Sequence, residues 1–324
     1  MTTSASVSPA VLEHRFEAMA TPVTMRVFEP TPGADALLYA AEALVRAVDR
    51  SCSRFRPDSE LSLVNNDPAE WHDVSPIFAA AVTVAEIGAI ETSGRIDPRV
   101  LDNLEDLGYS VTFDLIEPDG PPRRARLSPR LLTPFRAEHS PGRLRLDGTR
   151  IDLGGVAKGL AVDRAAAILA GAGSGVLVEA GGDLAVLGTG PDSGVWNVDV
   201  EDPLARGLER DTIAVLAVAE SGVATSSVRH RSWHRGGLRV HHLIDPATGE
   251  SANTGIVAVT VIAESTVVAE RWSKALFLAG SDAILAEADE RGIAALWVDD
   301  VGVLRFSREM DRHILWRSAD AHAG

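Results

Sequence analysis

Hydrophobic and polar positions follow two different spacings along the chain. Apolar residues that recur every three to four positions are typical of amphipathic helices, and alternating or continuous apolar runs are typical of strands. Helical spacing occurs in residues 34–55, 75–94, 156–173 and 269–277. Strand-like runs occur in residues 21–29, 174–188, 195–202, 212–227, 239–249, 256–265 and 293–307. The strands and helices come in unequal blocks, which favours an α+β fold over a doubly wound sheet.

Local signals add detail to this pattern. Ser75 and Pro76 supply a helix N-cap and a proline at the first helical position. Residues 57–67 are interpreted as a polar turn, and residues 142–155 as a hairpin with its turn at Asp147 and Gly148. Residues 117–130 contain four prolines, so we expect a loop or a marginal hairpin there.

Composition narrows the range of functions. The chain has 324 residues, of which 45% are hydrophobic and 24% charged, as in an ordinary globular protein. Its formal net charge of -15 argues against nucleic acid or an anionic membrane as partner. Cys52 is the only cysteine, so the chain forms no internal disulfide and no cysteine zinc site. No run approaches the length of a membrane-spanning helix, and we expect a cytoplasmic protein without membrane insertion.

The densest candidate chemistry lies in residues 152–163. Gly154 and Gly155 let the backbone approach a ligand, and the helix that follows offers N–H donors and a positive dipole end. Lys158 adds a point charge suited to phosphate. The spacing is not that of a P-loop. A purely structural strand-to-helix joint is the alternative.

Two further stretches carry polar residues next to glycine or proline. Gly181, Gly182 and Asp183 form either a tight turn or a ligand contact. His241 and His242 precede an Asp-Pro turn, and strand alternation places their side chains on opposite faces. One of them can therefore face a pocket. Upstream, residues 225–231 hold hydroxyls and arginines that suit either phosphate or ribose contacts or a solvated strand edge.

The order of these motifs resembles that of the ApbE-type FAD:protein FMN transferases over residues 13–310. The matching stretches include "IDLGGVAKGLAVDRA", "EAGGDLAVLG", "HHLIDPATG" and "VIAESTVVAERWSKALFLAG". The resemblance implies a single-chain α+β fold of mixed and antiparallel sheets, with packed helices and a central FAD cleft. Residues 1–12 would then be a flexible arm and residues 311–324 a C-terminal tail.

The resemblance also implies an activity and the residues that carry it. Such a protein transfers FMN from FAD to a threonine or serine hydroxyl of an acceptor flavoprotein and releases AMP. The protein would be a monomer or homodimer. His242 would assist deprotonation of the acceptor hydroxyl, and a histidine pKa near neutrality suits that role. The FAD contacts implied are Met19, Phe55, Arg95, Ile96, Asp97, Asp152, Lys158, Asp163, Gly181, Gly182, Asp183, Thr225, Ile244 and Asp245.

The chain departs from the family pattern at the implied magnesium site. There the Gly155 carbonyl joins an Asp-x-x-x-Thr pair, but this chain has Glu270 and Lys274. A protonated lysine has no lone pair and cannot ligate a cation. The tyrosine that usually follows residues 225–227 is also absent. Either Lys274, held by Glu270, replaces the metal at the FAD pyrophosphate, or the protein is an FAD carrier or sensor with weak or no transfer. A scaffold without flavin binding is the third alternative.

Overall fold

A large antiparallel sheet forms the centre of the molecule. The computed structural model describes residues 10–117, 119–121, 134–191, 194–205 and 211–318. Each neighbouring pair in the central sheet is antiparallel. In spatial order its strands are β1 (Val11–Ala18), β2 (Thr21–Phe28), β7 (Gly175–Ala180), β8 (Asp183–Gly188), β11 (Ser221–Ser227), β16 (Ile256–Ala263), β17 (Ala294–Asp299) and β18 (Leu304–Phe306).

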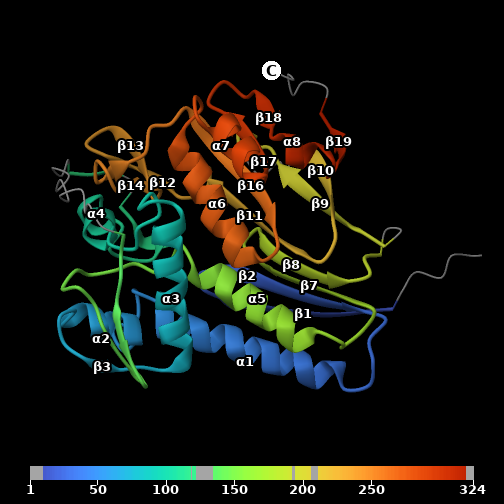
Figure 1. Ribbon diagram of the computed structural model, residues 1–324, viewed down its shortest axis with the longest axis horizontal. Helices are drawn as coiled ribbons and strands as arrows, with labels where there is room; N and C mark the ends of the chain where they lie inside the picture. The colour runs from blue at the N-terminus through green and yellow to red at the C-terminus, as the bar shows by residue number, and fades with distance from the viewer. Residues whose placement is uncertain (1–9, 118, 122–133, 192–193, 206–210, 319–324) are drawn as a thin grey trace, which may run out of the picture.

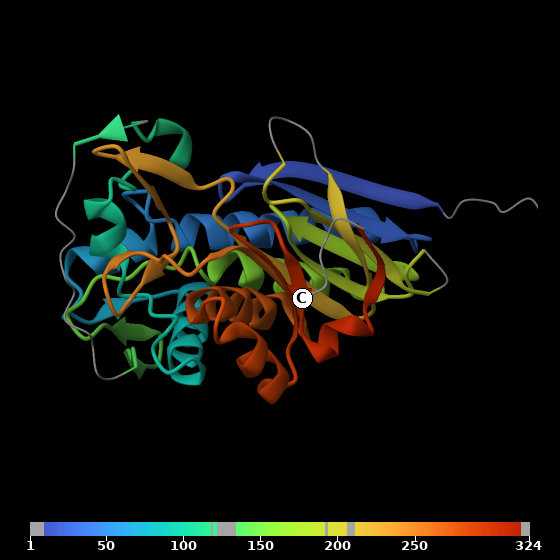
Figure 2. The ribbon, with the colours of Figure 1, turned by 90° about the horizontal axis from the view of Figure 1, so that it is seen from above.

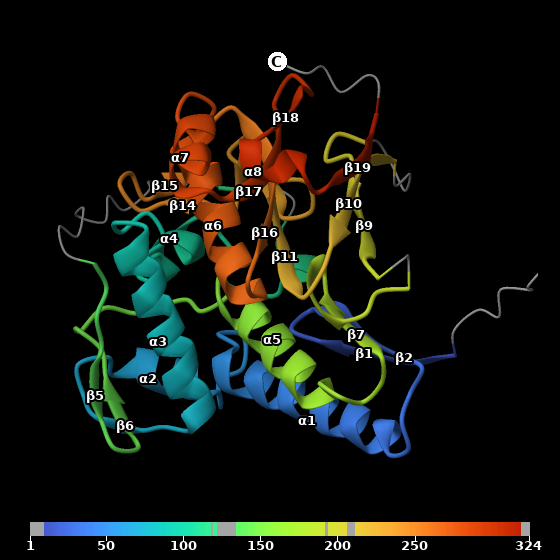
Figure 3. The same cartoon turned by 45° about the vertical axis from the view of Figure 1, so that its right-hand side comes forward.

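Three helices cover one face of this sheet (Figures 1 and 3). They are α1 (Ala34–Cys52), α5 (Ala157–Leu169) and α6 (Thr266–Ala279). Helix α5 packs on α1, β7 and β8, and α6 packs on α5, β11 and β16. The helices α1 and α5 therefore cover the first half of the sheet, and α6 covers the second.

A second, three-stranded sheet packs on the opposite face. It consists of β9 (Trp196–Glu201), β10 (Thr212–Val218) and β19 (Ile314–Arg317). Alternation along β11 shows the two layers: Val223 belongs to the apolar cluster with β9 and β10, whereas Ala224 belongs to the cluster with α6. This part of the central sheet is buried on both faces, which explains its continuous apolar runs.

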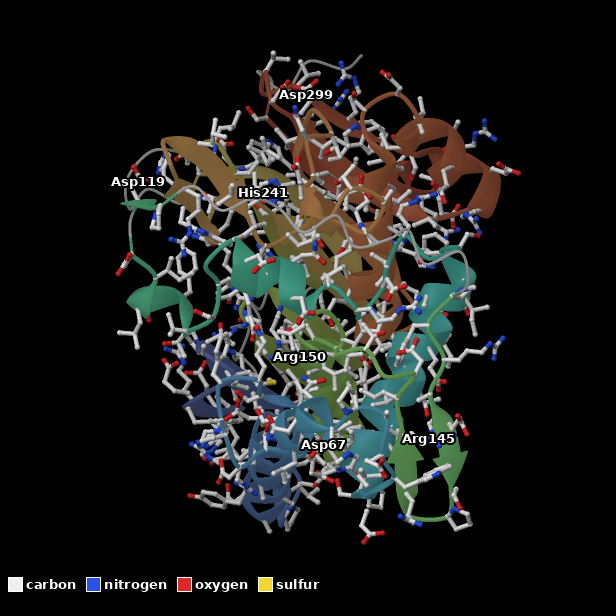
Figure 4. All side chains as sticks on the ribbon, turned by 90° about the vertical axis from the view of Figure 1, so that its left-hand side faces the viewer. Asp67, Asp119, Arg145, Arg150, His241 and Asp299 are labelled. Atoms are coloured by element: carbon white, nitrogen blue, oxygen red, sulfur yellow. The ribbon has the colours of Figure 1, made fainter. Side chains whose placement is uncertain are left out.

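The remaining elements lie around this core. The helices are α2 (Glu60–Asn66), α3 (Pro76–Glu91), α4 (Leu101–Asp106), the 3₁₀ turn η1 (Phe113–Leu115), α7 (Ile284–Arg291) and α8 (Arg308–Asp311). The strands are β3 (His72–Asp73), β4 (Asp119–Gly120), β5 (Glu138–Ser140), β6 (Arg143–Arg145), β12 (Ser232–Arg235), β13 (Leu238–His241), β14 (Ile244–Asp245) and β15 (Glu250–Ser251). Figure 4 shows His241 in the upper half of the molecule and Asp67 and Arg145 in the lower half.

The α+β architecture of mixed helices and antiparallel sheets is confirmed, and so are the long helices and most strands. Ser75 caps α3 as predicted, since its hydroxyl accepts a hydrogen bond from the Phe78 N–H at 3.2 Å. None of the helices in the described ranges is both long and apolar enough to cross a membrane.

Several local expectations differ from the structure. Residues 57–67 are not a simple turn, because Ser59 caps the short helix α2 by accepting from the Ser62 N–H at 3.0 Å. The predicted hairpin over 142–155 is wrong, since β6 pairs with the preceding strand β5. Beyond β6, the side chain of Asn65 satisfies the backbone N–H and carbonyl of Ile151, so no partner strand is needed there.

The two predicted terminal segments both contribute residues to paired strands. Val11 and Leu12, expected in the arm, lie in β1 and pair with β2. Residues 314–317, expected in the tail, form β19 and pair with β10. Most of the predicted loop at 117–130 lies outside the described residues.

Candidate functional site

A cleft of about 1380 Å³ lies between the central sheet, the C-terminal end of α1, the start of α5 and residues 270–278 of α6. The pairing of Val23 with Ala180 brings the turn between β1 and β2 beside the turn between β7 and β8. The contact is close: a side chain at Gly181, whose φ is +60°, would collide with the hydroxyl of Thr21. The two hairpin turns therefore form one wall of the cleft, and residues from α1, α5 and α6 form the others.

Aromatic residues form one end of the cleft. The segments that supply them, around α4, η1, β12 and β13, lie together at one end of the molecule (Figure 2). Phe55 and Tyr109 line the cleft with their ring centres 5.7 Å apart. The guanidinium of Arg54 contacts both rings, 4.2 Å from the Phe55 ring centre and 4.4 Å from that of Tyr109. Its Nε is 3.0 Å from a carboxylate oxygen of Asp152.

Four charged side chains gather at the start of α5. Lys158 contacts Asp183, and the Nζ of Lys274 lies 2.9 Å from Oε1 of Glu270. The second oxygen of Glu270 accepts the Gly159 N–H at 3.0 Å. Glu270 thus occupies one of the backbone donors at the N-terminus of α5 and holds Lys274 at the same time. All four charged side chains line the cleft.

The charges of this cluster stabilise one another. Burial opposes ionisation of Lys158, but Asp183 and Glu270 outweigh it and raise the pKa of the ammonium. Burial likewise opposes ionisation of Glu270, yet Lys274 and Lys158 outweigh it and lower the pKa of this carboxyl. The cluster therefore favours the charged forms of Lys158 and Glu270, whereas burial, together with the neighbouring Glu270, raises the pKa of the Asp183 carboxyl.

His242 lines the same cleft, whereas His241 does not. The prediction that the two side chains diverge is confirmed: Nε2 of His241 lies 2.9 Å from the Ala252 carbonyl and its ring meets Phe277 edge-on. Nδ1 of His242 donates a long hydrogen bond, 3.4 Å, to the Arg231 carbonyl, which leaves the Nε2 lone pair to accept a proton. Burial, then Arg231 and Lys274, lower the pKa of His242 well below 6.5. A pKa near neutrality was predicted for His242 from the sequence, but its lower pKa leaves the imidazole uncharged at pH 7.

The structure brings together most of the candidate residues from distant parts of the sequence. Those that line the cleft are Met19, Phe55, Arg95, Ile96, Asp97, Asp152, Gly155, Lys158, Gly181, Gly182, Asp183, Thr225, His242, Ile244, Glu270 and Lys274. Some of them also support the walls. Arg95, for example, donates to the Ala275 carbonyl at 3.0 Å and to Glu287 at 2.6 Å, which ties the cleft to α6 and α7.

Two candidates do not line the cleft. The carboxylate of Asp163 accepts the N–H groups of Thr266 and Val267 at 2.8 and 3.0 Å, so it caps the start of α6. Asp245 accepts the Ala247 N–H at 2.8 Å and organises the turn that follows β14. Both carboxylates hold backbone segments that carry cleft residues, and their expected contacts with FAD stay predictions.

Sequence reasoning missed Arg54 and Thr260. Arg54 directly precedes Phe55, but nothing local shows that Asp152 would be its partner. Thr260 lines the cleft opposite Thr225 on the neighbouring strand, with their hydroxyl oxygens 2.9 Å apart. The alternation along 256–265 could have indicated which face it occupies, but not that this face meets a cleft.

The model of the ApbE family matches residues 19–297 of this chain. The chain belongs to the ApbE family. An FAD:protein FMN transferase of Klebsiella pneumoniae is 30% identical over 275 residues, which are 82% of this chain and 77% of that protein. The corresponding protein of Haemophilus influenzae is 27% identical over 78% of this chain and 75% of its own length. The crystal structure of the ApbE protein of Thermotoga maritima, 28% identical, superposes with a TM-score of 0.82 over 94% of this chain and 99% of that one.

The magnesium site implied by the ApbE resemblance does not fit a metal ion in this chain. Both oxygens of Glu270 already have hydrogen-bond donors, and the Lys274 side chain lies against Gly155, with its Cε 3.5 Å from where a Cβ would be. A fixed ammonium therefore occupies the space between the two implied ligands. In the described ranges, no group of three or more His, Cys, Asp and Glu side chains is arranged to hold a metal.

Proposed function

We propose that this protein is an FAD:protein FMN transferase that moves FMN from FAD to a threonine or serine hydroxyl of an acceptor flavoprotein. One observation carries the proposal: neutral His242 and the Lys158–Asp183–Glu270–Lys274 cluster line a single cleft that also has an aromatic end. The cleft thus combines a proton acceptor, fixed cations for a pyrophosphate and flat apolar surfaces for ring systems.

The residues suit in-line phosphoryl transfer. The acceptor hydroxyl would bond to the phosphorus of the FMN half while the bond from that phosphorus to the AMP oxygen breaks. The hydroxyl proton would pass to Nε2 of His242, and AMP would leave. Lys158 and Lys274 would stabilise the negative charge that develops on the phosphoryl oxygens and the leaving group. The aromatic end, with Phe55 and Tyr109, would hold one of the ring systems of FAD.

The similarity to curated transferases supports transfer over a role as FAD carrier or sensor, and over a scaffold without flavin. The test incubates the purified protein with FAD and an acceptor flavoprotein that the Klebsiella pneumoniae transferase modifies, with that transferase as the positive control. Mass spectrometry should find one FMN on an acceptor threonine or serine, with an equal amount of AMP released. FAD binding without AMP release or acceptor modification would instead support the carrier role.

A further inference from the structure

The two lysines of the chain have an unusual distribution. Of its 31 lysine and arginine residues only two are lysines, Lys158 and Lys274, and both line the cleft. Lysine presents a compact ammonium with three donors, whereas arginine presents a wide planar fork. The chain uses arginine at every other cationic position, so lysine at these two sites matches a need for a small point charge.

Lys274 is held in one place. Its side chain is 17% exposed, and its partner Glu270 is only 1% exposed and fixed from the other side by the Gly159 N–H. One N–H of the ammonium bonds Glu270, which leaves two donors for other groups. Because Lys274 lines the cleft beside Gly155, these donors can serve a ligand there.

The charges of the cluster are already balanced. With both carboxylates ionised, the two ammonium groups and the two carboxylates sum to zero without any added ion. With threonine at position 274 the same cluster would carry one net negative charge, and it would need a cation before an anionic pyrophosphate could approach. With lysine, a divalent cation at the same place would lie next to a fixed positive charge and find no free carboxylate oxygen.

We infer that the Lys274 ammonium, positioned by Glu270 against Gly155, takes the place of a metal ion, so that this protein binds the pyrophosphate of FAD without a divalent cation. The inference rests on the proposed function, since it concerns how the same cleft holds FAD. It concerns binding, which can be measured without an acceptor protein and without turnover.

The first experiment is an FAD titration of the purified protein, followed by calorimetry, in EDTA and again in millimolar MgCl₂. The affinity of the wild-type protein should be the same within about twofold in the two buffers. Lys274→Thr should bind FAD at least about tenfold more weakly in EDTA, the effect expected when a charge-assisted hydrogen bond is lost. Magnesium should restore much of that affinity, because threonine returns an oxygen ligand.

Controls separate this effect from general loss of charge or fold. Arg143→Met removes an exposed cation outside the cleft and should leave the FAD affinity unchanged in both buffers. In wild-type protein labelled with [¹³C]lysine, the two lysine Cε signals can be assigned with Lys274→Arg, and FAD added in EDTA should shift the Lys274 signal. This spectroscopic readout needs no destabilised variant.

The outcomes are distinct. FAD binding by the wild-type protein that strengthens tenfold or more with magnesium would overturn the inference and leave the proposed function standing. So would wild-type affinity of Lys274→Thr in EDTA, or a Lys274 signal that FAD leaves in place. Absence of FAD binding in both buffers would overturn the proposed function together with the inference.

Discussion

Replacing Asp183 with asparagine removes one of the two carboxylates that neutralise the paired lysines of the cleft. Asp183 is 3% exposed at the side chain and contacts Lys158, which is 18% exposed. Its other oxygen accepts the Thr225 N–H at 3.3 Å, a bond that the asparagine carbonyl can keep. The substitution therefore removes charge with little change in shape, and it leaves Lys158 and Lys274 with Glu270 as the remaining carboxylate of the cluster.

The stability lost in Asp183→Asn follows from the burial of the ion pair between Asp183 and Lys158. Removing one partner of a buried ion pair destabilises a protein by about 3–5 kcal/mol. Lys158 lines an open cleft that admits water, so we expect the lower end, about 3 kcal/mol. At about 2.1 cal/mol/K per residue, 324 residues give an unfolding entropy of about 0.7 kcal/mol/K. The expected fall in Tm is therefore about 4 °C.

A double-mutant cycle tests this estimate: thermal and urea unfolding are measured for the wild-type protein, Asp183→Asn, Lys158→Met and the double variant. The double variant has no unpaired charge, so the coupling between the two changes should be about 2 kcal/mol. Asp73→Asn is the matched control, because Asp73 is 93% exposed in its ion pair with Arg143 and should give no measurable shift in Tm. A coupling below about 0.5 kcal/mol would show that the pair does not stabilise the fold and refute the reasoning.

Three other variants and probes test single features of the structure. His242→Ala should lower the rate of FMN transfer about 100-fold or more and leave FAD affinity nearly unchanged. Because the pKa of His242 lies well below 6.5, protonation of this side chain should reduce the wild-type rate only below pH 6.5, and a fall in rate near pH 7 would contradict this. Cys52 is 6% exposed and burial raises its pKa to about 12, so a thiol reagent at pH 8 should label it only in denaturant, and rapid labelling of the native protein would be inconsistent with its burial. Ala20 has a φ of +54° in the turn between β1 and β2, and Ala20→Gly should raise the free energy of unfolding by about 1 kcal/mol, whereas a decrease would argue against strain there.

Elements with a strong local signal could be predicted from the sequence. Helix α3 begins where Ser75 and Pro76 indicate, and the glycine pair at 181–182 forms the two-residue turn between β7 and β8. The hairpin expected at Asp147 and Gly148 was wrong because β6 pairs with β5, and beyond it a distant side chain, that of Asn65, satisfies the backbone of Ile151. Local turn residues do not reveal such a partner, since the bond joins residues far apart in the chain.

The same limit applies to the candidate site. A resemblance in motif order identified residues that line one cleft, but it could not distinguish Asp163, which caps α6, from Asp183, which contacts Lys158. Both are aspartates within matching motifs. The pKa of His242 also depends on burial and on Arg231 and Lys274, which only the folded chain brings near it.

Glu270 and Lys274 show why the spacing of two residues along a helix does not reveal where their ion pair lies in the fold. Their separation by four residues predicts an ordinary ion pair on a helix surface, yet Glu270 is buried and also accepts the Gly159 N–H of α5. That bond requires glycine, because a Cβ at position 159 would lie 2.9 Å from the carboxylate oxygen and 3.0 Å from the backbone of Val267. The longer glutamate side chain, the lysine and the glycine therefore act as one set, in which α5 holds the carboxylate that positions the ammonium. In Lys274→Thr the Gly159 N–H still holds one carboxylate oxygen of Glu270, and the other oxygen becomes available to bind a cation.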